Sequence, residues 1–152
     1  LVFTPIHFYS KMSYSITDRC IGCSICKKIC PTDAIEGKRG KIHTIKPKLC
    51  IDCGACGKIC PQESVKDSFH NTCKRIRFRL RWEKPAIKKE KCMSCNICIE
   101  ACPVNCLKLS YTQDNKNIRG YPILENERAC IACCFCAVEC PVDAIEMVVP
   151  AK

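Results

Sequence analysis

Cysteine is the residue type in this sequence with the clearest capacity for chemistry. Nineteen of the 152 residues are cysteines, well above the level typical of a chain held together by its cysteines. Sixteen of them form four copies of the pattern C-x2-C-x2-C-x3-C-P, with no position missing. Closely spaced thiolates are metal ligands, so the pattern indicates metal binding. The four copies span residues 20–31, 50–61, 92–103 and 130–141.

The repeated pattern resembles that of the bacterial-type ferredoxins, which carry two 4Fe-4S clusters, and it is present here twice in tandem. The resemblance covers about residues 13–69 and 84–149. It implies that three cysteines of each copy bind one cluster, while the fourth ligates the other cluster of its pair. The implied ligands are Cys20, Cys23, Cys26 and Cys60 for site one; Cys50, Cys53, Cys56 and Cys30 for site two; Cys92, Cys95, Cys98 and Cys140 for site three; and Cys130, Cys133, Cys136 and Cys102 for site four.

Zinc ligation and disulfide pairing fit the cysteines less well. Structural zinc sites usually use two ligand pairs well separated along the chain, whereas here four cysteines fall within eleven residues. A disulfide framework gives no reason for the fixed repeat, and an odd number of cysteines cannot all pair. A Cys-rich zinc or nucleic-acid-binding module is the alternative from another functional class.

Short strands and helices are expected around the motifs. Apolar or β-branched stretches lead into three of them, and the apolar residue in the tail after each Cys-Pro is expected to begin another strand. The residues before each Cys-Pro have room for about one helical turn. The predicted fold class is α+β, with two small pseudo-symmetric dicluster domains of two hairpins and two helices each. The expected strands lie at residues 14–17, 42–45 and 121–124 and begin at Ile35, Val65, Leu107 and Ile145.

The motifs divide the chain into four parts. The second pair of motifs is separated by twenty-seven residues and the first by nineteen, which predicts an extended hairpin over residues 108–121. Such a hairpin resembles the iron–sulfur subunits of complex I and membrane-bound hydrogenases; a tolerated loop insertion is the alternative. The predicted parts are an N-terminal extension (1–12, with Met12 a candidate start), a first domain (13–70), a linker strand (71–83) and a second domain (84–152).

The linker alternates arginines with large apolar residues. This period of two predicts a strand whose apolar face packs against a domain. Its basic face is open to three interpretations: a solvated edge that resists strand pairing, a docking surface for an acidic redox partner or subunit, or a nucleic-acid contact. The alternating residues are Arg75, Arg77, Arg79 and Arg81 with Ile76, Phe78, Leu80 and Trp82.

Three cysteines and three histidines lie outside the implied ligand set. Cys106 occupies a position held by alanine or serine in the other repeats and is expected to be a small buried residue. Structural or incidental roles are expected for Cys73 and Cys134 as well. No ligand position is vacant, so His7, His43 and His70 are expected to be solvated or locally hydrogen-bonded.

The sequence contains no phosphate loop, dinucleotide fingerprint or nucleophile–base pair, so no substrate site of its own is expected. Four clusters with all-cysteine ligation predict low-potential electron transfer, on the order of −400 mV. The chain is interpreted as a non-catalytic iron–sulfur subunit of a larger anaerobic oxidoreductase of the hydrogenase, formate or aldehyde dehydrogenase, or flavin-enzyme type. The alternative is a freely diffusing polyferredoxin.

Composition sets two further expectations. No apolar run is long enough for a transmembrane helix, and the N-terminus lacks signal-peptide features, which favours a cytoplasmic protein, either free or peripheral to a membrane complex. The formal charge of +10 counts every thiol as neutral. An oxidised cluster with four thiolates carries −2, so four clusters would cancel most of the positive charge, and nucleic-acid binding is not expected.

Overall fold

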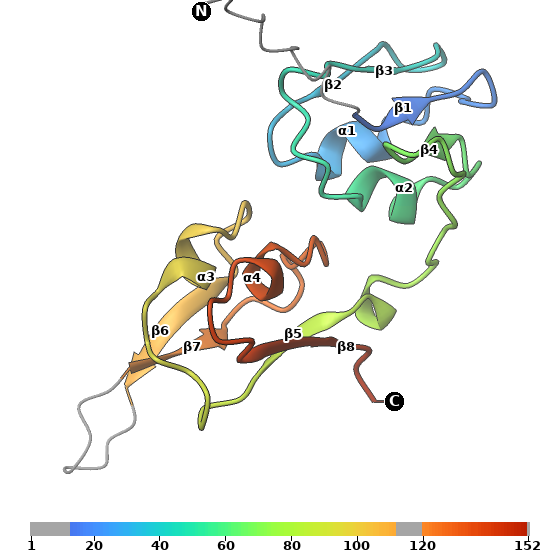
Figure 1. The fold of residues 1–152 in the computed structure, drawn as a ribbon. Helices are drawn as coiled ribbons and strands as arrows, with labels where there is room; N and C mark the ends of the chain where they lie inside the picture. Colours follow the sequence, from blue (N-terminus) through green and yellow to red (C-terminus); the bar gives the residue numbers. More distant parts are fainter. Residues whose placement is uncertain (1–12, 112–119, 152) are drawn as a thin grey trace, which may run out of the picture.

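The computed structural model describes residues 13–111 and 120–151, which form two lobes joined by an extended segment (Figure 1). Both lobes have the same order of elements. The first consists of β1 (Ser15–Ile16), α1 (Ile25–Ile29), β2 (Ile35–Glu36), β3 (Thr44–Ile45), α2 (Ala55–Ile59) and β4 (Val65–Lys66). The second consists of β5 (Lys84–Ile87), α3 (Ile97–Glu100), β6 (Leu107–Tyr111), β7 (Gly120–Leu124), α4 (Phe135–Val138) and β8 (Ile145–Val148).

The strands pair in antiparallel ribbons of two. In the first lobe β2 pairs with β3 and β1 pairs with β4; in the second, β6 pairs with β7 and β5 pairs with β8. The α+β class and the duplicated arrangement are therefore confirmed. Only one ribbon in each lobe is a hairpin between successive strands, because the other joins the first and last strands of the lobe. That second ribbon brings the two ends of each lobe together.

The backbone repeats as closely as the sequence does. Each motif has a left-handed residue immediately before its helix, and these four residues, Ser24, Gly54, Asn96 and Cys134, have φ between 62° and 71°. A left-handed backbone conformation raises the free energy of residues other than glycine. It persists where the surrounding structure holds the residue in that conformation. The turn that it makes leads directly into a helix of only four or five residues.

The long hairpin of the second lobe has five-residue strands, where the equivalent β2 and β3 have two residues each. Leu107 is opposite Leu124 and Tyr111 is opposite Gly120. Its tip, and the N-terminal extension, lie outside the described residues. The expected lengthening is thus confirmed for the part of the hairpin that the structure describes.

The prediction of a strand through the linker is wrong. Residues 74–78 run without a strand partner, and Arg79–Arg81 form a turn of 3₁₀ helix. Of the apolar residues in the alternating stretch only Trp82 is buried, while Phe78 is 55% and Leu80 65% exposed. Alternation predicts a strand only where a neighbouring strand supplies hydrogen bonds. The strands on either side of the linker, β4 and β5, are already paired with β1 and β8.

Trp82 anchors the contact between the two lobes. It has no exposed surface and packs in one cluster with Ala55 of α2 and with Ile131 and Ala132 of the last motif. Its indole Nε1 donates a hydrogen bond to the carbonyl oxygen of Ile76 at 3.0 Å. The linker thus contributes its one buried side chain to a small apolar core between the lobes.

Candidate metal centres

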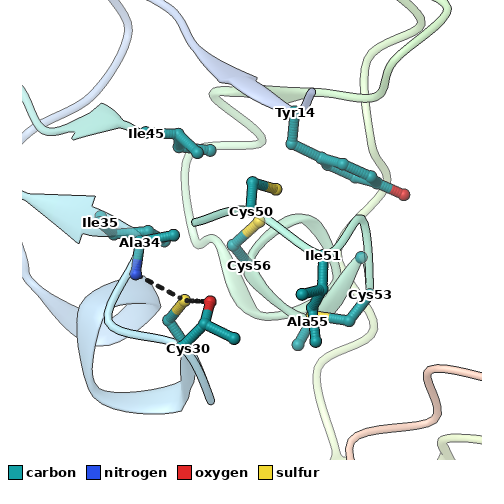
Figure 2. Close-up of a pocket in the computed structure, with 12 residues that line it drawn as sticks. Tyr14, Cys30, Ala34, Ile35, Ile45, Cys50, Ile51, Cys53, Ala55 and Cys56 are labelled. Atoms are coloured by element: carbon teal, nitrogen blue, oxygen red, sulfur yellow. Dashed lines mark hydrogen bonds between the residues drawn. The ribbon is translucent and has the colours of Figure 1, made fainter. Parts of the chain in front are cut away.

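Cavities in both lobes are lined by the cysteine sets that the ferredoxin resemblance implies. The cavity of site two has Cys50, Cys53 and Cys56 on one side, while Cys30 approaches from the end of α1 (Figure 2). A second cavity is lined by the four cysteines of site one and a third by the four of site three. In each case the fourth cysteine comes from the other motif of the lobe, so the exchange between motifs is compatible with the fold.

Site four is more tightly closed. Cys102, Cys130 and Cys136 are buried in the same core cluster, and Cys133 is half-buried beside the contact between the lobes. At the other extreme, Cys95 of site three is exposed. The four sites therefore range from a solvent-facing position to an enclosed one.

The arrangement of thiols suits a cubane better than a single ion. Four thiolates around one zinc ion must converge at about 2.3 Å from it. Within residues 13–111 and 120–151, no three Cys, His, Asp or Glu side chains converge in that way. A 4Fe-4S cluster requires no such convergence, because each thiolate binds a different iron.

One hydrogen bond recurs at all four Cys-Pro turns. The cysteine of each turn accepts a hydrogen bond from the backbone N–H four residues later, at 3.2–3.5 Å. Such N–H···S bonds stabilise negative charge on the sulfur and help to set a reduction potential. The pairs are Ala34 with Cys30, Ser64 with Cys60, Cys106 with Cys102, and Ala144 with Cys140.

Three of these four turns add a side-chain donor: the Thr32 hydroxyl lies 3.7 Å from the sulfur of Cys30, and in two other turns the residue four positions after the cysteine is the donor. The Ser64 hydroxyl lies 3.2 Å from the sulfur of Cys60, and the Cys106 thiol lies 3.4 Å from the sulfur of Cys102. A ligating cysteine is a thiolate, so the hydroxyl and the thiol are the donors when a cluster is bound. Cys106 is buried, as predicted, but its contact with an implied ligand could not be read from its position in the repeat.

Replacing Ser64 by alanine should lower the reduction potential of site one. The substitution removes the hydroxyl donor to Cys60 and leaves the backbone donor in place. We expect a shift of up to about 60 mV, equivalent to a tenfold change in a one-electron equilibrium, in an anaerobic redox titration. Ala34→Ser places a hydroxyl beside Cys30 and should raise the potential of site two. Unchanged potentials in both variants would contradict the role of this position.

Burial favours the protonated form of three of these cysteines before metal binds. It raises the pKa of Cys26 to about 11 and that of Cys136 to about 12, and it also raises the pKa of Cys56. Metal binding must therefore displace protons from these sites. Such thiols are inert small apolar groups until iron replaces the proton.

Several neighbours of the sites carry no sequence signal. Tyr14 lines the cavity of site two, and burial, with the nearby Cys73 as a further cause, raises its pKa to about 12. A side chain at Gly54 would meet the Tyr14 hydroxyl at 3.0 Å, so the absence of a Cβ at this position leaves room for Tyr14. Lys58 and Lys84 lie at the contact between the lobes, and the cysteine motif does not indicate this position.

The residues outside the ligand set have local partners. His43 is buried and hydrogen-bonded to the Ser24 hydroxyl and the Lys41 carbonyl, both at 3.0 Å. His70 is exposed, and His7 lies outside the described residues. Cys73 packs against Gly57, where an added side chain would collide with it. Cys134 donates to the carbonyl of Ala132 at 3.7 Å.

Comparison with known families decides the cofactor. Residues 19–65 match the model of the 4Fe-4S dicluster domain, and residues 85–108 match that of the 4Fe-4S binding domain. The chain contains two 4Fe-4S ferredoxin-type domains. It binds four 4Fe-4S clusters, two in each ferredoxin domain, and its function is electron transfer.

The wider comparisons add context to the ferredoxin assignment. No curated protein matches the chain. Among solved structures, a chain of the formate dehydrogenase–heterodisulfide reductase–formylmethanofuran dehydrogenase complex from Methanospirillum hungatei matches at 19% identity and a TM-score of 0.43. The match covers 94% of this chain and 55% of that chain, so this chain spans about half of its length. No helix in the described residues is long and apolar enough to cross a membrane.

Proposed function

We propose that the chain is a non-catalytic electron wire within a larger anaerobic, cytoplasmic oxidoreductase. The sixteen cysteines of the four motifs act as ligands in the sets given for sites one to four. When bound, a 4Fe-4S cluster exchanges one electron with little rearrangement. The observation that carries this proposal is the apolar contact between the lobes, because it joins two pairs of sites into one row.

The contact between the lobes brings site two next to site four. Cys53 and Cys133 line one cleft, together with Gly54 and Ala132. Burial is the largest cause of the raised pKa of Cys133, and the charges of Cys102 and Cys53 raise it further. Sites one and two share the first lobe, and sites three and four share the second. The geometry thus supports a row in which the sites follow in the order site one, site two, site four and site three.

A groove beside the linker supports docking of a protein partner. It is lined by Arg77, Phe78, Arg79 and Leu80 from the linker and by Glu127 and Arg128 from the turn before the last motif. The guanidinium groups of Arg77 and Arg81 lie 5.4 Å and 5.8 Å from the centre of the Phe78 ring. A groove with several arginines and exposed apolar side chains fits an acidic surface that also presents apolar residues.

Reversing the charge of Arg77 and Arg79 together should slow reduction of the chain by its physiological partner. Opposite charges steer association, so we expect the rate to fall at least about tenfold at low salt, with a smaller difference at high salt. Rapid-mixing kinetics at two ionic strengths would measure it. Lys38→Glu with Arg39→Glu makes the same change of charge at exposed positions of the first lobe. Equal rates for the two double variants would rule out docking at the groove.

Native purification separates a stable subunit from a free carrier. Anaerobic size-exclusion chromatography of material from the source cells should show the chain in a larger assembly. Mass spectrometry of that fraction then identifies the accompanying chains. Elution as a single chain of 17.1 kDa would contradict the subunit and leave the freely diffusing polyferredoxin.

A further inference from the structure

Lys84 is a buried cation with no carboxylate beside it. The residue lies on β5 and is only 5% exposed. Its Nζ donates a hydrogen bond to the carbonyl oxygen of Cys130 at 3.2 Å. Among the described residues no Asp or Glu forms an ion pair with it. A buried ammonium group is costly unless negative charge compensates for it.

A second cation reaches the same segment from the other lobe. Lys58 lies on α2, and its Nζ donates to the carbonyl oxygen of Ala132, between Cys130 and Cys133. The ammonium group also lies 6.0 Å from the centre of the Trp82 ring. Lys58 likewise has no carboxylate partner in the part of the chain that the structure describes. Two lysines from different elements therefore converge on one four-residue stretch of site four.

Cys106 adds a hydrogen-bond donor to the same site. Its thiol lies 3.4 Å from the sulfur of Cys102, and its backbone N–H donates to the same sulfur at 3.4 Å. A ligating cysteine is a thiolate, so the Cys106 thiol is the donor to Cys102 when a cluster is bound. The environment thus favours negative charge on the sulfurs of site four.

The other sites lack this combination. The positions equivalent to Lys58 hold Lys28, Glu100 and Val138, all of which are exposed. The positions equivalent to Cys106 hold alanine at sites two and three, and serine at site one. The Ser64 hydroxyl gives site one a donor, but no buried lysine accompanies it in the described residues.

We propose that Lys84, Lys58 and Cys106 give site four the highest reduction potential of the four sites. This inference rests on the proposed ligand sets. The oxidised site carries −2 and the reduced site −3, so nearby positive charge and an S–H donor stabilise the reduced form more strongly. Electrons delivered to the row therefore collect at its interior, where the lobes meet. The arginine groove borders this point, because Arg128 is two residues before Cys130.

An anaerobic redox titration of the four-cluster protein, followed by electron paramagnetic resonance, tests the assignment. Cys106→Ala should lower the potential of the cluster that is reduced first, because the Cys106 thiol donates to Cys102, a proposed ligand of site four. Lys84→Met should lower the same wave, making its reduction about tenfold less favourable, which is about 59 mV for one electron. Lys58→Met should lower it too, with a smaller effect on site two.

Two variants separate charge from packing. Lys84→Arg keeps the cation and should restore the potential that Lys84→Met loses. Lys28→Met removes a lysine at the equivalent exposed position of α1 and should leave the first wave unchanged. The proposal is overturned if Cys106→Ala moves a later wave, or if Lys84→Met leaves the first wave in place while iron content and circular dichroism are retained. If the proposed function is wrong, the redox titration of the wild-type chain shows fewer than four one-electron waves. That result is distinct from the two outcomes that overturn the assignment of site four.

Discussion

Removal of iron is expected to unfold most of the chain. Nine of the nineteen buried apolar residues in the described structure are cysteines, and eight of these nine are proposed ligands. The helices have four or five residues and the strands two to five, too few to be stable without a core. Binding of the metal is therefore coupled to folding. Anaerobic treatment with a strong iron chelator should abolish most of the far-ultraviolet circular dichroism.

The unfolding should be reversed by iron and sulfide together. Reconstitution with both should restore the spectrum, whereas zinc alone should not, because the thiols in residues 13–111 and 120–151 do not converge on one ion. Incubation in the same buffer without chelator serves as the control. A native spectrum that persists after all iron has been removed would show that the polypeptide forms its own core, contrary to this account.

Replacement of Trp82 by alanine should separate the two lobes. The side chain is fully buried against Ala55, Ile131 and Ala132, and its removal leaves a cavity in a small core. Loss of a buried aromatic side chain costs about 3–5 kcal/mol. We expect a lower denaturant midpoint for cluster loss and a larger radius of gyration by X-ray scattering. Transfer of electrons from one lobe to the other should fall, since the proposed sites two and four meet at this contact.

Phe78→Ala is the matched control for Trp82→Ala. Both substitutions truncate an aromatic residue of the same linker, but Phe78 is 55% exposed and outside the core between the lobes. Its replacement should change stability by no more than about 0.5 kcal/mol. Similar midpoints and similar scattering for the two variants would show that Trp82 does not hold the lobes together.

The fold around the motifs could be predicted because its causes are local. Ile35, Val65, Leu107 and Ile145 each begin a strand, as their place after a Cys-Pro turn predicts. The single helical turn before each Cys-Pro follows from the spacing of the cysteines and the helix-ending effect of proline. The candidate ligand sets could be proposed at the same stage, since every motif position is filled.

The features that depend on contacts between distant segments could not be predicted. Ile76, Phe78 and Leu80 follow the alternation of a strand but have no partner strand, so they stay largely exposed. Lys84 resembles any lysine of a basic linker until β5 pairs with β8 and buries it against Cys130. Lys58 likewise gains its partner only when the lobes meet.

Metal and sulfide content is the most direct test of the central claim. Protein purified under anaerobic conditions should contain about 16 iron atoms and about 16 acid-labile sulfides per chain, since four clusters contribute four of each. Iron, zinc and sulfide should be measured on one sample and normalised to protein by amino-acid analysis. Four zinc ions per chain and no sulfide would contradict the account, and about eight iron atoms with eight sulfides would reduce the row to two sites.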